Sequence, residues 1–161
     1  MSCAIALALT LLAAPEAAAA ATTAPAASAA VAVTPALARE PMYADIVRRA
    51  MALNVEAGRL AELTAANKPL PRYEGFKADL AALGALDMQG HLDLKARGTD
   101  GDLKCILKGI SEDLPKRLAE YETAKTVETR VQALKEMSYL LNDNVEVITS
   151  PPGPATPPPA G

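Results

Sequence analysis

Asp87 and His91 are the first residues in this sequence whose types and spacing could do chemistry. They are four residues apart, so they would lie on one face of a helix. Leu80, Leu83 and Leu94 would share that face, which predicts that both polar side chains point into a helical core. Because bundle cores can hold metals and haem, Asp87 and His91 are candidate metal ligands, and His91 is a candidate cofactor-binding residue. A hydrogen-bonded Asp–His pair, or a helix that turns to expose both residues, is the simpler alternative.

The rest of the sequence gives a metal or haem site little support. His91 is the only histidine, so the paired Glu-x-x-His motifs of di-metal bundles are absent. Covalent haem attachment needs a Cys-x-x-Cys-His motif, which the chain also lacks. Non-covalent haem could be held by His91 with Met42, Met51 or Met137, although methionines at helical spacing more often fill a core. We therefore expect no cofactor.

Cys105 is the remaining candidate. At 100° per residue it lies about 200° from Leu103, opposite the apolar stripe of its helix. Cys3 belongs to a leader that we expect to be removed, so the mature chain would hold one cysteine. A single sulfur excludes an internal disulfide and a Cys-based metal cage, and it makes Cys105 a candidate for an intermolecular disulfide in a homodimer. A shielded, inert thiol is the alternative, and a catalytic cysteine would need His91 as its partner.

Composition excludes several function classes. The formal net charge is −3 and no basic patch occurs, so nucleic acid is not an expected partner. The chain has one Phe, four Tyr and no Trp, which leaves few side chains for stacking on bases. Gly-rich phosphate loops, the Gly-x-Ser-x-Gly elbow and His-Glu-x-x-His are absent, so we name no catalytic residue. We predict a non-catalytic binding or interaction module with an unidentified protein partner, and a haem- or metal-carrying bundle built on His91 is the alternative.

Four segments with helical periodicity must position these residues. The first follows Pro41, and the second runs from near Tyr73 to Gly98. Thr99 or Asp100 would then cap the third. The four apolar stripes are Met42, Ile46, Ala50, Leu53, Ala57, Leu60 and Thr64; Phe76, Leu80, Leu83, Leu86 or Asp87, Gly90, His91 and Leu94; Leu103, Ile106, Leu107, Ile110, Leu114, Leu118 and Tyr121; and Val127, Val131, Leu134, Met137 or Ser138, Leu141, Val145 and Ile148.

Three local features leave parts of this pattern open. Gly84 and Gly90 each weaken the second helix by about 1 kcal/mol relative to Ala. Pro115 lies inside the third stripe, whose phase continues past it, and this favours one kinked helix over two short helices. Thr126 is the expected N-cap of the fourth helix, and the spacing favours helix over an extended segment through residues 142–148.

Four amphipathic helices joined by short connections predict an all-α fold, namely an antiparallel up-down-up-down four-helix bundle over residues 41–148. A domain of that length can form a core without disulfides. The tail, residues 149–161, contains six prolines and is expected to be disordered.

The first forty residues predict export. Residues 1–25 resemble a signal peptide, because a short apolar core precedes the small residues that a signal peptidase requires. Several Ala-x-Ala sites fit equally well, and no Lys or Arg precedes the apolar core. Residues 26–40 form an Ala/Pro/Thr-rich linker. We expect a periplasmic or secreted protein with no transmembrane segment in the mature chain, and a disordered leader on a cytoplasmic protein is the alternative.

Overall fold

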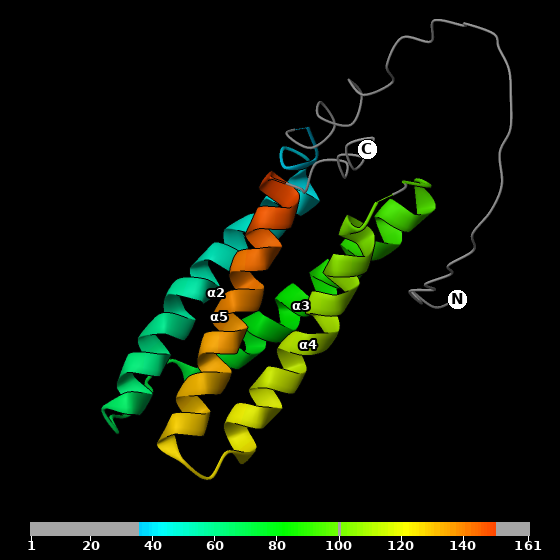
Figure 1. Ribbon diagram of the computed structural model, residues 1–161. Coiled ribbons are helices and arrows are strands. Elements are labelled where there is room, and N and C mark those ends of the chain that lie inside the picture. The colour runs from blue at the N-terminus through cyan, green and yellow to red at the C-terminus, as the bar shows by residue number, and fades with distance from the viewer. Residues whose placement is uncertain (1–35, 100, 151–161) are drawn as a thin grey trace, which may run out of the picture.

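The computed structural model describes residues 36–99 and 101–150, and these form an all-α four-helix bundle. The helices are α2 (Pro41–Ala65), α3 (Tyr73–Ala96), α4 (Leu103–Thr123) and α5 (Val127–Thr149). Helix α2 packs along α5, α3 along α4, and α4 along α5, whereas the contact between α2 and α3 is less extensive (Figure 1). The predicted fold class is therefore confirmed. The proposed signal peptide, most of the linker and the proline-rich tail lie outside the described residues.

Two of the helix starts follow the sequence prediction. Pro41 occupies the first turn of α2, where its missing N–H group costs no hydrogen bond. Helix α5 begins with a capping box: Thr126 Oγ1 accepts the Thr129 amide at 3.2 Å, and Thr129 Oγ1 accepts the Thr126 amide at 3.4 Å. Helix α5 then continues through residues 142–148, as predicted.

The predicted start of α4 is wrong. Its N-cap is Asp102, which makes no side-chain capping bond. The Thr99 hydroxyl instead donates to the Leu94 carbonyl at 2.9 Å, so this residue helps to end α3 rather than to begin α4. Asp100, the other predicted cap, lies outside the described residues.

Helix α4 is a single helix that includes Pro115. Proline has no N–H group, so the Ser111 carbonyl lacks its helical partner. Gly84 of α3 is buried against this point, where a Cβ atom would lie 3.5 Å from the Ser111 carbonyl oxygen. A Cβ atom at this distance would make ordinary van der Waals contact, so Gly84 packs closely against α4 while leaving room for a small side chain.

Gly90 is packed more tightly than Gly84. A Cβ atom at this position would lie 3.1 Å from Leu107 Cδ1 of α4 and 3.4 Å from Tyr43 Cε1 of α2. The absent side chain therefore makes room for core residues of two neighbouring helices. Gly90, which weakens α3 as an isolated helix, is therefore a position that lets α3 pack.

The core is mainly aliphatic. Its largest fully buried apolar side chains are Tyr43, Phe76, Ile46, Leu60, Leu83, Leu107, Leu114, Leu134, Met137, Leu141 and Ile148. Leu37, in the segment that we assigned to the linker, also packs into this core. The polar residues buried with them are Thr64, Asp87, His91 and Asn144. None of the described helices combines the length and the apolar character that crossing a membrane requires.

Candidate functional site

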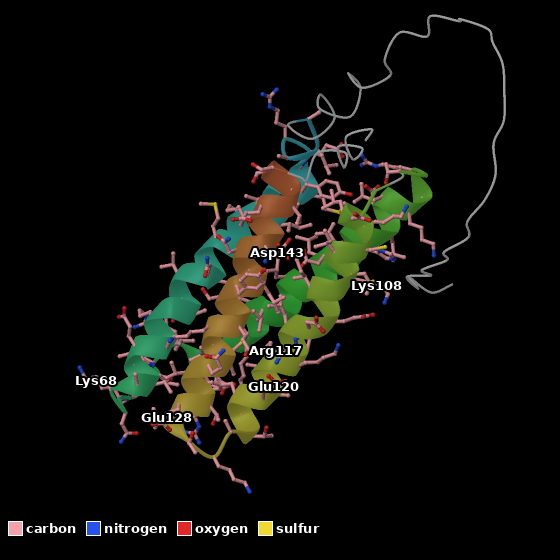
Figure 2. The ribbon with its side chains drawn as sticks, in the orientation of Figure 1. Lys68, Lys108, Arg117, Glu120, Glu128 and Asp143 are labelled. Atoms are coloured by element: carbon pink, nitrogen blue, oxygen red, sulfur yellow. The ribbon has the colours of Figure 1, made fainter. Side chains whose placement is uncertain are left out.

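Asp87 lies in the centre of the bundle and pairs with a residue that the sequence analysis did not single out. Its side chain is fully buried, as is that of Asn144 on α5. Asn144 Nδ2 donates to both carboxyl oxygens of Asp87, at 3.0 and 2.9 Å. Asp143, labelled in Figure 2, marks the level of this pair on α5. The pair crosses the core between two helices that are not neighbours around the bundle.

Two consequences follow from the burial of this pair. Burial raises the pKa of Asp87 to about 7, although the hydrogen bond from Asn144 acts in the opposite direction. Asn144 Oδ1 is the one buried side-chain polar atom among the described residues that has no hydrogen-bond partner. Asn144 could have been recognised from its spacing, because it lies three residues after Leu141 and four before Ile148. The predicted apolar stripe of this helix contained Val145 instead of Asn144, and Val145 is only partly buried.

His91 is also buried, as predicted, but it contacts a different helix. Its Nδ1 atom lies 2.5 Å from the Lys104 carbonyl oxygen of α4. A carbonyl oxygen only accepts hydrogen bonds, so Nδ1 carries the proton and Nε2 keeps a lone pair. Nε2 makes no hydrogen bond with the described residues and is not among the buried unpartnered atoms, so it retains contact with solvent.

Asp87 and His91 therefore share a helix face without sharing a site. Asp87 bonds to Asn144 of α5, whereas His91 bonds to the backbone of α4. No group of three or more His, Cys, Asp or Glu side chains in residues 36–99 and 101–150 is placed to hold a metal ion. Their roles as ligands stay predictions.

Cys105 is less accessible than its angular position suggests. It lies on the α4 turn that begins at Leu103, and its side chain is of intermediate exposure. Cys3 lies outside the described residues. An intermolecular disulfide through Cys105 stays a prediction, and migration on a non-reducing gel tests it.

A cleft between α2 and α3 brings charged side chains next to buried apolar ones. Its volume is about 310 Å³. Leu53 and Phe76, which are almost fully buried, form its apolar part. The complete lining is Arg48, Arg49, Ala52, Leu53, Glu56, Arg72, Phe76 and Asp79. No motif or spacing in the sequence indicates this cleft, because its three arginines are brought together only when two helices pack.

The arginines of this cleft differ in their existing partners. Asp45 accepts a hydrogen bond from Arg49 at 2.8 Å and also pairs with Arg48. These arginines hold the pKa of Asp45 below its usual range. Arg72 is the N-cap residue of α3, and its guanidinium group makes no hydrogen bond or ion pair with any side chain that the structure describes. It is therefore the cleft cation most available to a ligand.

The two acidic residues of the cleft, Glu56 and Asp79, offset the positive charge of Arg72 only in part. Glu56 accepts two bonds from Arg59, at 2.8 and 3.0 Å, and these lower its pKa, with a weaker contribution from the charge of Arg72. This carboxylate is already neutralised by Arg59, a residue outside the lining. Asp79 is exposed and adds one negative charge at the edge of the cleft.

A group of hydrogen bonds and ion pairs fixes the other end of the α2–α3 contact. Arg97, just after α3, donates to both carboxyl oxygens of Glu40 at 2.9 and 2.6 Å, and it pairs with Asp93 at 2.8 Å. The Tyr43 hydroxyl donates to Asp93 at 2.8 Å and to the Gly90 carbonyl at 3.3 Å. These bonds hold the start of α2 against the end of α3.

A second hollow lies between α4 and α5. Arg117, labelled in Figure 2, bonds to Glu120 on its own helix at 2.6 Å and to Glu136 on α5 at 2.8 Å. Its charge is therefore already satisfied by two carboxylates. The other cation of this hollow, Lys125, is exposed, and the lining holds no large buried apolar side chain comparable to Leu53 or Phe76 of the cleft.

Comparison with known proteins supplies no relative. No protein-family model matches this chain, and no match is found among curated proteins or solved structures.

Proposed function

We propose that this protein is an exported, non-catalytic binding module whose ligand site is the α2–α3 cleft. The observation that carries the proposal is Arg72, which has no hydrogen-bonded partner and lies beside the buried side chains of Leu53 and Phe76. A guanidinium group next to an apolar surface suits a ligand that joins an anionic group to an apolar body. The expected ligand class is a small amphipathic anion, with a carboxylate, sulfonate or phosphate as its charged group.

Binding of anilinonaphthalene sulfonate, a fluorescent amphipathic anion, tests this site. Arg72→Glu should weaken binding by about tenfold or more, because it replaces a charge-assisted hydrogen bond with repulsion. The Arg72 side chain is exposed and has no internal hydrogen bond to lose, so the variant should fold normally. The matched control is Lys135→Glu on α5, which makes the same charge change at an exposed residue outside the cleft. Equal affinities for the two variants and the wild type would rule out the cleft.

The proposed location, periplasmic or secreted, rests on the sequence alone. Its support is the short apolar run before residue 15 and the small residues that follow it.

A second candidate function, a cofactor-carrying bundle, rests on one observation at His91. The bond from Nδ1 to the Lys104 carbonyl leaves the Nε2 lone pair available, which is the usual arrangement of a histidine that binds a metal. Titration with ferric haem tests this role. A shift of the haem absorption band that is lost in His91→Gln would support it, and a shift that persists in the variant would exclude His91 as the ligand.

A further inference from the structure

The Asp87–Asn144 pair has a property that ligand binding in the cleft does not explain. We propose that it is a buried proton-binding site, in which a neutral Asp87 carboxyl pairs reciprocally with the Asn144 amide. Loss of the proton breaks this reciprocal pairing, leaves a buried negative charge in the core and loosens the contact between α3 and α5.

The hydrogen bonding of the pair is incomplete when Asp87 is ionised. A carboxylate only accepts hydrogen bonds, and both of its oxygens already accept from Asn144 Nδ2. Asn144 Oδ1 is then left in the core without a donor. A buried polar atom in this state costs about 1–3 kcal/mol.

A proton on Asp87 completes the pair. The protonated carboxyl has one O–H donor and one carbonyl acceptor, and the primary amide of Asn144 has a matching acceptor and donor. A small rotation of the amide lets Asp87 donate to Oδ1 while Nδ2 donates to the Asp87 carbonyl oxygen. Both side chains are then satisfied, and the core contains no net charge.

No nearby cation stabilises the ionised form. Charged and titratable side chains on the helices around Asp87 include Arg49 and Tyr43 on α2, His91 on α3, Lys108 on α4 and Asp143 on α5, and none of them contributes to the shift in the pKa of Asp87. Arg49 pairs with Asp45, Tyr43 bonds to Asp93, His91 bonds to the Lys104 carbonyl, and Lys108 pairs with Glu112. Asp143 is partly exposed and negative, so it would not favour a second negative charge. Burial is consequently the main influence on the pKa of Asp87, which rises to about 7.

The direction of the pH effect follows from this rise. An aspartate in an unfolded chain titrates near pH 4, so the folded protein holds the Asp87 proton more tightly than the unfolded chain does. The contribution to stability is complete below about pH 4 and is lost as the pH rises toward 7. The ion-paired carboxylates Glu40, Asp45 and Glu56 act in the opposite sense, because their pKa values are lowered and their contribution is lost in acid.

Urea unfolding at pH 5 and pH 8 tests the proposal, because the carboxylates with lowered pKa values stay ionised over this range. The unfolding equilibrium constant of the wild type should rise by up to about 100-fold from pH 5 to pH 8. Asp87→Asn keeps two reciprocal amide bonds at every pH, so its constant should change little. Asp143→Asn is the matched control on the residue before Asn144, and it should keep the wild-type dependence. His91→Gln removes the only histidine, and this variant should also keep the wild-type pH dependence of unfolding.

A direct titration keeps the proposal testable if the variants fold poorly. The carboxyl carbon of Asp87, followed by NMR in the wild-type protein, should titrate near pH 7. A midpoint below pH 5 would overturn the proposal. So would a wild-type unfolding constant that is equal at the two pH values, or a pH dependence that survives in Asp87→Asn.

Discussion

Asn144 occupies a central core position where an aliphatic side chain is the usual choice. Its amide is the only hydrogen-bonding partner of the Asp87 carboxyl group among the described residues. Removing it would leave a buried carboxyl with no donor, which is costlier than losing an exposed bond. Asn142, two residues earlier, provides the comparison, because its bond to Glu146 at 2.9 Å is exposed.

Asn144→Ala should therefore lower the free energy of unfolding by about 1–3 kcal/mol at pH 8, and by less at pH 5. It should also raise the pKa of Asp87 further, because the lost hydrogen bond favoured the ionised form. Denaturation at both pH values and NMR titration of Asp87 measure the two effects. Asn142→Ala should show neither effect. Equal losses of unfolding free energy in Asn144→Ala and Asn142→Ala would contradict the role of Asn144 as the buried partner of Asp87.

At the scale of the helices, each element has a clear inner and outer face. Leu107 of α4 and Leu134 of α5 are almost fully buried. Lys108 and Gln132 lie one and two residues away, with side chains engaged in surface bonds to Glu112 and Glu136 respectively.

Leu107→Ala and Leu134→Ala should each lower the free energy of unfolding by about 2–5 kcal/mol, because each leaves a cavity in the core. Lys108→Ala and Gln132→Ala should change it by about 0.5 kcal/mol or less. Chemical denaturation of the four variants checks the assignment of faces. Losses of similar size on both faces would show that these helices are rotated relative to the structure.

Glycine substitutions separate helix propensity from packing. A Cβ atom added at Gly58 of α2 would meet no neighbouring element within 4 Å, whereas one added at Gly90 of α3 would lie 3.1 Å from Leu107 Cδ1. Gly58→Ala should raise the free energy of unfolding by about 1 kcal/mol. Gly90→Ala should lower it, because buried side chains must move. Thermal or urea denaturation decides, and an equal gain at both positions would show that the α2–α3–α4 contact is looser than described.

The helices could be predicted from sequence because apolar spacing and helix-end residues are local. The capping box at Thr126 and the start at Pro41 are examples. The start of α4 could not be predicted in this way. The Thr99 hydroxyl can either cap the next helix or bond to the preceding one, and only the folded chain shows that it donates to the Leu94 carbonyl. Burial of Asp87 and His91 was predictable from their shared face, but their partners lie on two other helices.

At the scale of the whole molecule, two polar contacts cross the core between opposite helices. Asp87 of α3 meets Asn144 of α5, and Thr64 of α2 lies 3.3 Å from Tyr121 of α4. Aliphatic contacts tolerate sliding, whereas hydrogen bonds require specific partners. These two contacts therefore set how far each helix is shifted along the bundle axis.

The whole-molecule prediction concerns processing of the chain. If residues 1–25 are an export signal, the mature protein should begin between about residues 20 and 27, after one of the Ala-x-Ala sites. Intact-mass analysis of the native protein measures this start, and cell fractionation gives the compartment. A cytosolic chain that still begins at Met1 or Ser2 would contradict export.

Gly84 and Gly90 also bear on the order in which the bundle assembles. With two buried glycines, α3 gains little from its own backbone preferences, so its helical state depends on α2 and α4 being in place. Helix α5 has a capping box and no glycine, and it can persist with less support. The amides of α3 should accordingly be among the first to exchange with deuterated solvent and among the last to become protected during refolding. The helix that forms one wall of the cleft would then also be the most transient part of the bundle.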